Sequence, residues 1–215
     1  MKKQIWTHDE RHIGRLILGA DEVGVGALAG PIVASAVVLR AGTHIVGVRD
    51  SKKMTESGRE FCVSAVQEEA MCWYTGWSDS EVVDSLGMHQ ARLQVMGYCV
   101  EHVFRMLRTR TKEEPLIVVD GDQRLPISLE HIALIGGDDK SIAVAAASII
   151  AKVTRDRHMR KLHLDFPQYD WGANKGYGTP KHLAALDWSG INEHHRRNLA
   201  RRTLRRYQAK KESAS

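Results

Sequence analysis

Cysteine is scarce in this chain of 215 residues, which has three: Cys62, Cys72 and Cys99. No two of them form a Cys-x-x-Cys pair, and the eleven histidines are scattered, so the spacing of a zinc site is missing. An odd and small number of cysteines is typical of proteins kept in a reducing cytosol. We therefore expect a cytoplasmic protein that is held together by a packed core rather than by disulfides.

Long hydrophobic runs are absent as well. No segment approaches the ~20 consecutive apolar residues of a membrane-spanning helix. The basic residues of segment 1–15 are not followed by the apolar stretch of a signal peptide. The sequence therefore predicts a protein that neither spans nor binds a membrane. Its length fits one large domain or a domain with a small appendage.

Positive charge is concentrated at the C-terminal end. Segment 195–211 holds eight lysines and arginines and no acid, whereas the whole chain has a net charge of only +5. Arg197, Arg201 and Arg205 recur every four residues, so a helix would present them on one face. This pattern favours an arm that contacts a nucleic-acid backbone, and the alternative is a solvated basic tail.

Hydrophobic periodicity and glycine punctuation predict alternating strands and helices. We expect strands over 15–20, 32–40 and 71–77, a strand that ends at residue 120 and a weak one within 131–137. We expect helices over 59–70, 80–86, 89–107 and 141–162, and another that opens near Pro180. This order predicts an α/β domain with a mixed sheet over 1–187, followed by a basic helical segment over 188–215.

Acidic residues fall at the ends of the expected strands. Asp21 and Glu22 end the first, Asp120 ends another, and Asp138 follows the weak one, with Asp139 as a rival beside it. Each acid alone has an ordinary explanation, as a turn residue or as a favourable charge near a helix N-terminus. Gathered at one edge of a sheet, they would repel one another unless a hard divalent cation such as Mg²⁺ or Mn²⁺ lay among them.

Six ordered blocks of the sequence carry a resemblance to a known family. They are LILGADEVGVGALAGPIVASAVVL, DSKKMTESGRE, IVVDGD, GGDDKSIAVAAASIIAKVTRDR, FPQYDWGANKGYGTPKH and HHRRN, and they span about residues 16–198. In this order the blocks resemble ribonuclease HII. The resemblance implies a ribonuclease H-like fold, which is a mixed five-stranded sheet flanked by helices, here with a C-terminal helical extension.

The resemblance also implies an activity and its catalytic residues. Such enzymes cleave the RNA strand of RNA–DNA hybrids and leave a 3′-hydroxyl and a 5′-phosphate. Asp21, Glu22, Asp120 and Asp138 match the family's metal-binding carboxylates, and the distance to Ser148 favours Asp138 over Asp139. Two ions held by these acids would clamp the attacking water and the leaving oxygen.

Further residues gain substrate-binding roles from the same resemblance. Tyr177 resembles the tyrosine that stacks on the sugar beside the scissile junction. Lys52 and Ser148 resemble phosphate contacts, and loop residues Gly24, Val25 and Gly26 correspond to a loop that approaches the 2′-hydroxyls. The basic arginines Arg197 and Arg201 would add contacts to the hybrid backbone. The expected partner is therefore an RNA–DNA hybrid or ribonucleotide-containing DNA, bound by a monomer.

One departure from the family pattern lies in that loop. The family carries Gly-Arg-Gly, and Val25 replaces the arginine here. Related ribonuclease HIII proteins also lack the arginine, but they have a glutamate as the fourth acid and an extra N-terminal domain. We expect an atypical ribonuclease HII with weakened preference for single embedded ribonucleotides. The alternatives are a catalytically impaired hybrid-binding protein and a related nuclease that acts on DNA.

Overall fold

The computed structural model describes residues 6–48 and 54–213. Their contacts form two compact units that alternate along the chain. The first unit comprises Met1–Val23, Val33–Trp77 and Arg92–Val153, and the second comprises Gly24–Ile32, Ser78–Ala91 and Thr154–Ser215. The boundary expected at residue 187 falls within the second unit, so a separate C-terminal segment stays a prediction.

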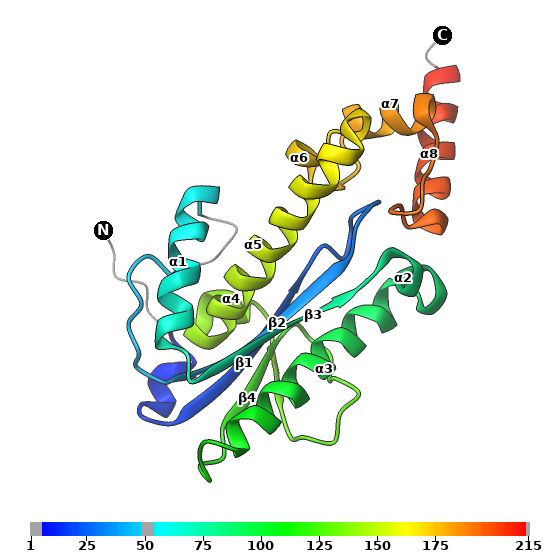
Figure 1. Cartoon of the computed structure of the whole chain (residues 1–215). Coiled ribbons are helices and arrows are strands. Elements are labelled where there is room, and N and C mark those ends of the chain that lie inside the picture. Colours follow the sequence, from blue (N-terminus) through cyan, green and yellow to red (C-terminus); the bar gives the residue numbers. More distant parts are fainter. Residues whose placement is uncertain (1–5, 49–53, 214–215) are drawn as a thin grey trace. The chain divides into compact units, whose positions relative to one another are not determined.

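The first unit is built on a mixed sheet, as predicted (Figure 1). Its strand order is β3-β2-β1-β4-β5. β1 is antiparallel to β2 and parallel to β4, and β4 is parallel to β5. The strands are β1 (Leu16–Val23), β2 (Ile32–Arg40), β3 (Cys72–Ser78), β4 (Leu116–Asp120) and β5 (Ile132–Leu134).

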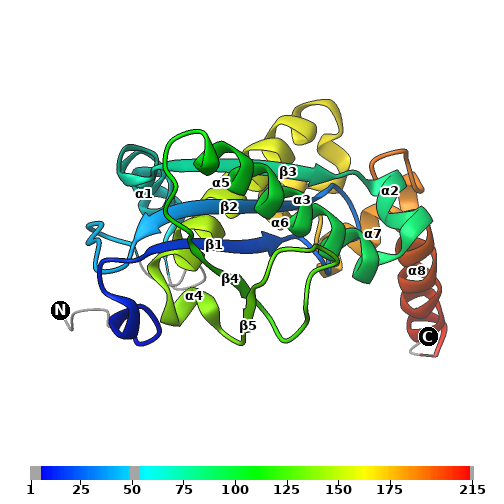
Figure 2. The same ribbon diagram turned by 90° about the horizontal axis from the view of Figure 1, so that it is seen from below.

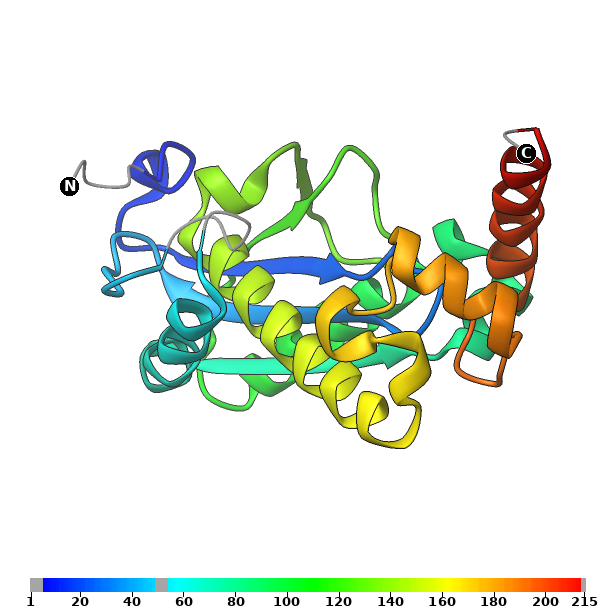
Figure 3. The same cartoon turned by 90° about the horizontal axis from the view of Figure 1, so that it is seen from above.

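Two helices pack on one face of this sheet, α1 (Glu56–Glu69) and the first half of α5 (Ile142–Asp165) (Figure 3). The small residues at the start of α5 allow a close approach. A Cβ added at Gly19 of β1 would lie 2.3 Å from the Ala143 carbonyl carbon and from the Val144 nitrogen. The backbone of α5 therefore touches β1 two residues before Asp21.

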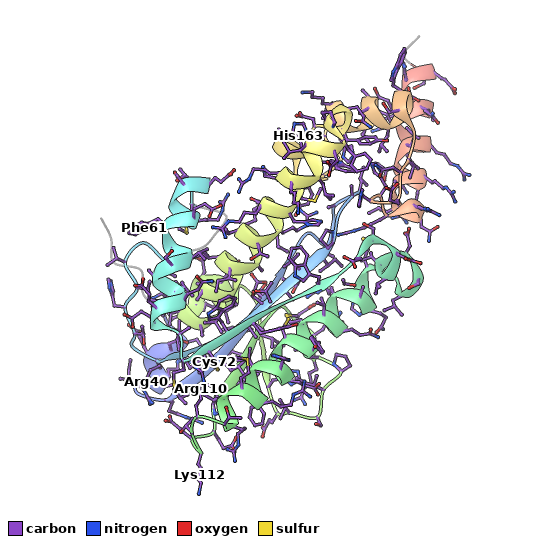
Figure 4. The ribbon with its side chains drawn as sticks, viewed as in Figure 1. Arg40, Phe61, Cys72, Arg110, Lys112 and His163 are labelled. Atoms are coloured by element: carbon purple, nitrogen blue, oxygen red, sulfur yellow. The ribbon has the colours of Figure 1, made fainter. Side chains whose placement is uncertain are left out.

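The other face is covered by α3 (Met88–Arg108), as Figure 2 shows. The Cys99 thiol of α3 donates to the Ala34 carbonyl of β2 at 3.3 Å. Just beyond the helix, Arg110 donates to the carbonyl of Met71, next to the labelled Cys72 in Figure 4. These contacts hold the part of α3 from Arg92 onward against the sheet.

Two features near the acids differ from the sequence-based expectation. β1 continues to Val23, because β2 pairs with it as far as Val33, so Asp21 and Glu22 lie within the strand rather than after it. A short helix, α4 (Gly137–Lys140), precedes α5 and holds Asp138. Four residues between two glycines and a longer helix carry no periodic signal, and α4 was therefore not predicted.

The second unit is helical and has its own core. That core contains Leu28, Met159, Tyr169, Trp171 and Leu186. Besides the second half of α5, the unit contains α2 (Ser80–Leu86), η3 (Pro167–Tyr169), α6 (Trp171–Asn174), α7 (Pro180–Ser189) and α8 (Arg197–Glu212). The continuous basic C-terminal helix was predicted. Within the two described stretches, no helix is long and apolar enough to cross a membrane.

Candidate active site

Asp21 is one of two buried residues among the four predicted metal ligands, with Asp138. Its side chain is buried in β1, opposite Ser35 of β2. One carboxylate oxygen, Oδ1, accepts a hydrogen bond from the backbone N–H of Glu22 at 2.7 Å. Ser148 of α5 also hydrogen-bonds to this carboxyl. Ser148, predicted as a phosphate contact, therefore holds Asp21 in position.

The electrostatics of Asp21 show that several acids lie near one another. Burial raises the pKa of Asp21 well above its usual value, and the charges of Glu22 and Asp120 raise it further. The hydrogen bond from Ser148 opposes this shift. The fold thus holds a buried carboxyl beside two like charges, which is costly unless a cation compensates them.

Asp120 and Asp138 are linked through the start of α4. The Asp120 Oδ1 accepts a hydrogen bond from the backbone N–H of Gly137 at 2.7 Å. A Cβ at Gly137 would stand 3.3 Å from that oxygen, so glycine permits the close approach. Asp138 is the next residue and is buried, whereas its neighbour Asp139 is half-buried. This difference supports Asp138 over its rival.

Glu22 has a partner that the sequence did not indicate. The Nε of Arg92, near the start of α3, lies 3.1 Å from the Glu22 Oε1. The two side chains are 23% and 10% exposed. Arg92 also lies against the turn after β4, since a Cβ at Gly121 would be 3.0 Å from its Nη2. An arginine thus accompanies the acids.

The donor set suits a hard divalent cation, because it consists of carboxylate oxygens and because Glu22 and Asp120 disfavour the ionised form of Asp21 when no cation is present. Across the described residues, no group of three or more histidine, cysteine, aspartate or glutamate side chains is arranged so that it could hold an ion as it stands. Asp21, Glu22 and Asp120 interact electrostatically, and Asp138 follows the glycine that binds Asp120. Ion binding would therefore require these side chains to converge.

In the second unit, a buried arginine organises the loop that contains Val25. Arg196 donates through Nη2 to the Gly24 carbonyl at 2.6 Å and through Nη1 to the Val25 carbonyl at 2.5 Å. Its Nε and Nη2 donate to Gly30 at 3.1 and 3.0 Å. Burial and the nearby charge of Arg155 lower the pKa of Arg196 to about 9. The carbonyl oxygens of Gly24 and Val25 therefore point toward the buried guanidinium of Arg196.

A second buried arginine, Arg155 of α5, ties the same loop to Tyr177. It donates to the carbonyls of Ala29 and Pro31 at 3.0 and 2.8 Å, and to that of Lys175 at 2.8 Å. Its guanidinium carbon lies 5.5 Å from the centre of the Tyr177 ring. Tyr177 is 36% exposed. The structure therefore brings Tyr177 and the loop together within one unit.

The two glycines that flank Val25 are not equivalent. Gly24 has a φ of +88°, and a Cβ there would lie 2.1 Å from the Arg155 Nε. Gly26 has open space around its Cα and no positive φ. The backbone conformation therefore requires glycine at position 24 but not at position 26.

The predicted backbone contacts Arg197 and Arg201 both lie exposed on α8. Arg201 joins Asn198, Arg202, Arg205 and Arg206 in lining a surface cavity of ≈ 570 Å³. The start of the helix is capped by Asp84 of α2, which accepts from the backbone N–H groups of Arg197 and Asn198 at 2.5 and 3.1 Å. Lys52 lies outside the described residues.

The structure thus brings together Asp21, Glu22, Asp120 and Ser148 in the first unit, and the loop and Tyr177 in the second. Sequence reasoning missed Arg92, Arg155 and Arg196. Arg155 and Arg196 stand inside two of the quoted blocks, so their position could have drawn attention. Arg92 stands in a helix with no unusual pattern and gave no signal.

Comparisons with known proteins identify the family and the fold. The family model described as Ribonuclease HII matches residues 18–206. The chain is 40% identical to a Ribonuclease HII from Wolbachia pipientis subsp. Culex pipiens, covering 89% of this chain and 93% of that one. It resembles the crystal structure of ribonuclease H2 from Pyrococcus horikoshii OT3, with a TM-score of 0.68, 25% identity and coverage of 90% and 99%. Bst-RNase HIII in complex with Mn²⁺ shares the fold, with a TM-score of 0.67, 17% identity and coverage of 92% and 73%.

Proposed function

Since the chain belongs to the ribonuclease HII family and is an endoribonuclease of the ribonuclease H type 2 class acting on RNA–DNA hybrids, we propose that Asp21, Glu22, Asp120 and Asp138 form its catalytic centre. The observation that carries this proposal is geometric: Asp21 is buried within electrostatic reach of Glu22 and Asp120, and Asp138 directly follows Gly137, whose N–H donates to Asp120 at 2.7 Å. Carboxylates held together in this way provide the oxygen ligands that Mg²⁺ and Mn²⁺ prefer.

The proposed reaction is hydrolysis of the RNA strand that leaves a 3′-hydroxyl and a 5′-phosphate. Two bound divalent ions would supply Lewis-acid stabilisation of the attacking and leaving oxygens. The Mn²⁺ complex of Bst-RNase HIII supports an ion of this kind. Ser148 keeps the Asp21 carboxylate oriented, and the Gly137 N–H does the same for Asp120. These hydrogen bonds limit the reorganisation needed when the ligands converge.

The substrate would be held by the loop of Gly24, Val25 and Gly26, by Tyr177, and by Arg197 and Arg201. Arg155 and Arg196 donate hydrogen bonds to backbone carbonyls of segment 24–31. Within the described residues, the N–H groups of Val25 and Gly26 donate to no backbone carbonyl. These two donors are suited to ribose hydroxyls. We propose Lys52 and Ser148 as additional phosphate contacts, and binding by a monomer.

Two neighbouring pairs of acids allow a matched test of the catalytic set. Asp138→Asn and Asp120→Asn should each reduce Mg²⁺- or Mn²⁺-dependent cleavage of a labelled hybrid by at least about a hundredfold. The control variants Asp139→Asn and Asp122→Asn each remove one negative charge within two residues of the tested acid, and both should cleave the hybrid at the normal rate. Equal effects within each pair would contradict the assignment. Hybrid binding by the unaltered protein without cutting in either ion would favour the catalytically impaired alternative.

Val25 supports a finer proposal about specificity. Its carbonyl is already bound by Arg196, so the backbone of the loop does not depend on the side chain at this position. The fixed charge and donors of an arginine are nevertheless missing. We expect cleavage of long hybrids to be retained and preference for a single ribonucleotide in duplex DNA to be weak. Val25→Arg should raise that preference. Strong junction-positioned cutting by the unaltered protein would contradict the proposal.

A further inference from the structure

Arg92 places a permanent positive charge among the acids of the first unit. Its Nε lies 3.1 Å from the Glu22 Oε1, and neither side chain is widely exposed. Its Nη2 is near the turn at Gly121, directly after Asp120. One guanidinium therefore lies next to two of the chain positions that contribute carboxylates.

A guanidinium in this position has two opposite effects on the acids. It stabilises the Glu22 carboxylate, which lies beside the buried Asp21 and raises the pKa of that group. It also repels any second cation, and it shares the oxygen that such a cation would use.

We propose that Arg92 is a positioning residue that acts as a built-in counter-cation of Glu22 and sets a weak affinity for divalent ions at the catalytic centre. This inference rests on the proposed function, because it assumes that Glu22 is an ion ligand. Arg92 orients Glu22 before an ion binds, and it raises the ion concentration needed to fill the centre.

Direct ion binding tests the proposal without reference to activity. The full-length protein and its Arg92→Gln variant are titrated with Mn²⁺ by calorimetry in the absence of nucleic acid. Arg92→Gln should bind Mn²⁺ about tenfold tighter, since a tenfold change in affinity corresponds to ~1.4 kcal/mol of relieved repulsion. Arg92→Lys, which keeps the charge, should remain within about threefold of the unaltered protein.

Two controls separate the contact from general charge effects. Arg105→Gln removes an exposed arginine from the same helix and should leave Mn²⁺ affinity unchanged. In a Glu22→Gln background, the gain from Arg92→Gln should shrink, because the pair that it breaks is already gone. Circular dichroism and thermal unfolding establish that each variant is folded, and Arg92→Met, which also removes the charge and should also bind Mn²⁺ about tenfold tighter, serves if Arg92→Gln is not.

The outcomes distinguish this inference from the function on which it rests. If the unaltered protein binds Mn²⁺ and Asp138→Asn weakens that binding, while Arg92→Gln binds equally or more weakly, the counter-cation role is wrong and the catalytic centre stands. Unchanged Mn²⁺ affinity with weaker hybrid binding would make Arg92 a substrate contact instead. No Mn²⁺ binding by the unaltered protein would overturn both proposals.

Discussion

The Asp21 carboxyl is buried in β1, where Glu22 and Asp120 disfavour its ionised form. Asn has nearly the same shape and no charge, so Asp21→Asn should remove the repulsion and raise the thermal stability of the protein. Each kcal/mol relieved corresponds to an increase of about 2–4 °C in Tm for a chain of this size. Calorimetry without divalent ions measures the change, and hydrolysis of the hybrid should be lost in the same variant.

The control for this prediction is Asp122→Asn, an exposed acid just after β4. It should change neither Tm nor activity appreciably. A lower Tm for Asp21→Asn would mean that the hydrogen bonds from Ser148 and from the Glu22 N–H are worth more than the repulsion. In that case Asp21 would stabilise the fold, and its raised pKa would not indicate a metal site.

Gly24 and Gly26 provide a second comparison between single residues. Gly24→Ala forces a side chain into a φ of +88° and against the buried Arg155, whereas Gly26→Ala enters open space. We expect Gly24→Ala to lose at least about 1–2 kcal/mol of unfolding free energy, and Gly26→Ala to lose less than about 0.5 kcal/mol. Urea unfolding measures both, and equal losses would show that the loop is not held by Arg155.

Individual contacts of side chains with distant residues were the least predictable features of the structure. Arg92 with Glu22, and Asp9 with the Ile142 N–H at 2.7 Å, join positions that are far apart in the chain. A local pattern gives the element on which a residue lies and the face it occupies, but it does not name the partner. The four acids were proposed as metal ligands because they matched ordered blocks of one family, and that role stays a prediction.

At the scale of elements, α8 carries the predicted contribution to substrate affinity. Removing the chain after Glu193 would also delete Arg196, which holds the loop at Gly24 and Val25, so truncation would confound two effects. The double variant Arg197→Gln and Arg201→Gln leaves the loop intact. It should raise KM and reduce the slope of log KM against log salt by about 2, or roughly one for each lost phosphate contact.

A matched control removes two exposed arginines elsewhere, Arg11→Gln with Arg105→Gln, and so keeps the net charge equal to that of the α8 variant. The control should retain the salt slope of the unaltered protein. If both double variants flatten the slope equally, the total charge rather than the basic helix governs hybrid binding, and α8 is a bystander.

Most elements followed from periodicity, and the misses have local causes. The strand over 15–20 was extended to Val23 by pairing with β2, which is a contact that no single-strand pattern reveals. α4 was missed because four residues are too short for a period to show. Both differences concern the acids, because Asp21 and Glu22 lie inside the paired part of β1 and Asp138 lies on α4.

At the scale of the molecule, stability should depend on a buried histidine pair in the second unit. The Nε2 atoms of His182 and His195 are 3.2 Å apart, and Trp171 donates to His182 at 3.1 Å. Burial, followed by the charges of neighbouring histidines, lowers the pKa of His195 to about 3. Burial also lowers the pKa of His182. Both histidines are therefore neutral in the folded protein.

Because these pKa values lie below the unfolded value of 6.5, the unfolded chain gains protons first as the pH falls. Stability is full above pH ~6.5 and declines toward the folded pKa by up to about 1.4 kcal/mol per pH unit for each histidine. His195→Gln should flatten the decline in urea unfolding between pH 7 and 5, and exposed His89→Gln should not. Asp21, whose pKa is raised, makes the stability change with pH in the opposite direction. All the variants compared contain Asp21, so the comparison cancels its contribution. Parallel curves would contradict the prediction.

The family and the mixed sheet could be predicted because six blocks in a fixed order constrain the whole chain. The division into two units could not, because the chain passes between them at Val23, Ile32, Trp77, Ala91 and Val153. The crossings at Val23 and Ile32 lie beside Gly24, Gly30 and Pro31, which fit an ordinary turn between two strands equally well, and those at Ala91 and Val153 lie inside helices. The continuous helix α5 itself belongs to both units, so no change of composition marks the passage.

The central claim is that four acids from separate parts of the chain bind divalent ions together. Anomalous diffraction from a crystal of the unaltered protein soaked in Mn²⁺ tests it most directly. The account predicts strong peaks about 2.1–2.3 Å from carboxylate oxygens of Asp21, Glu22, Asp120 and Asp138. Peaks that lie elsewhere, or a fully exchanged crystal with no peak at these side chains, would contradict it.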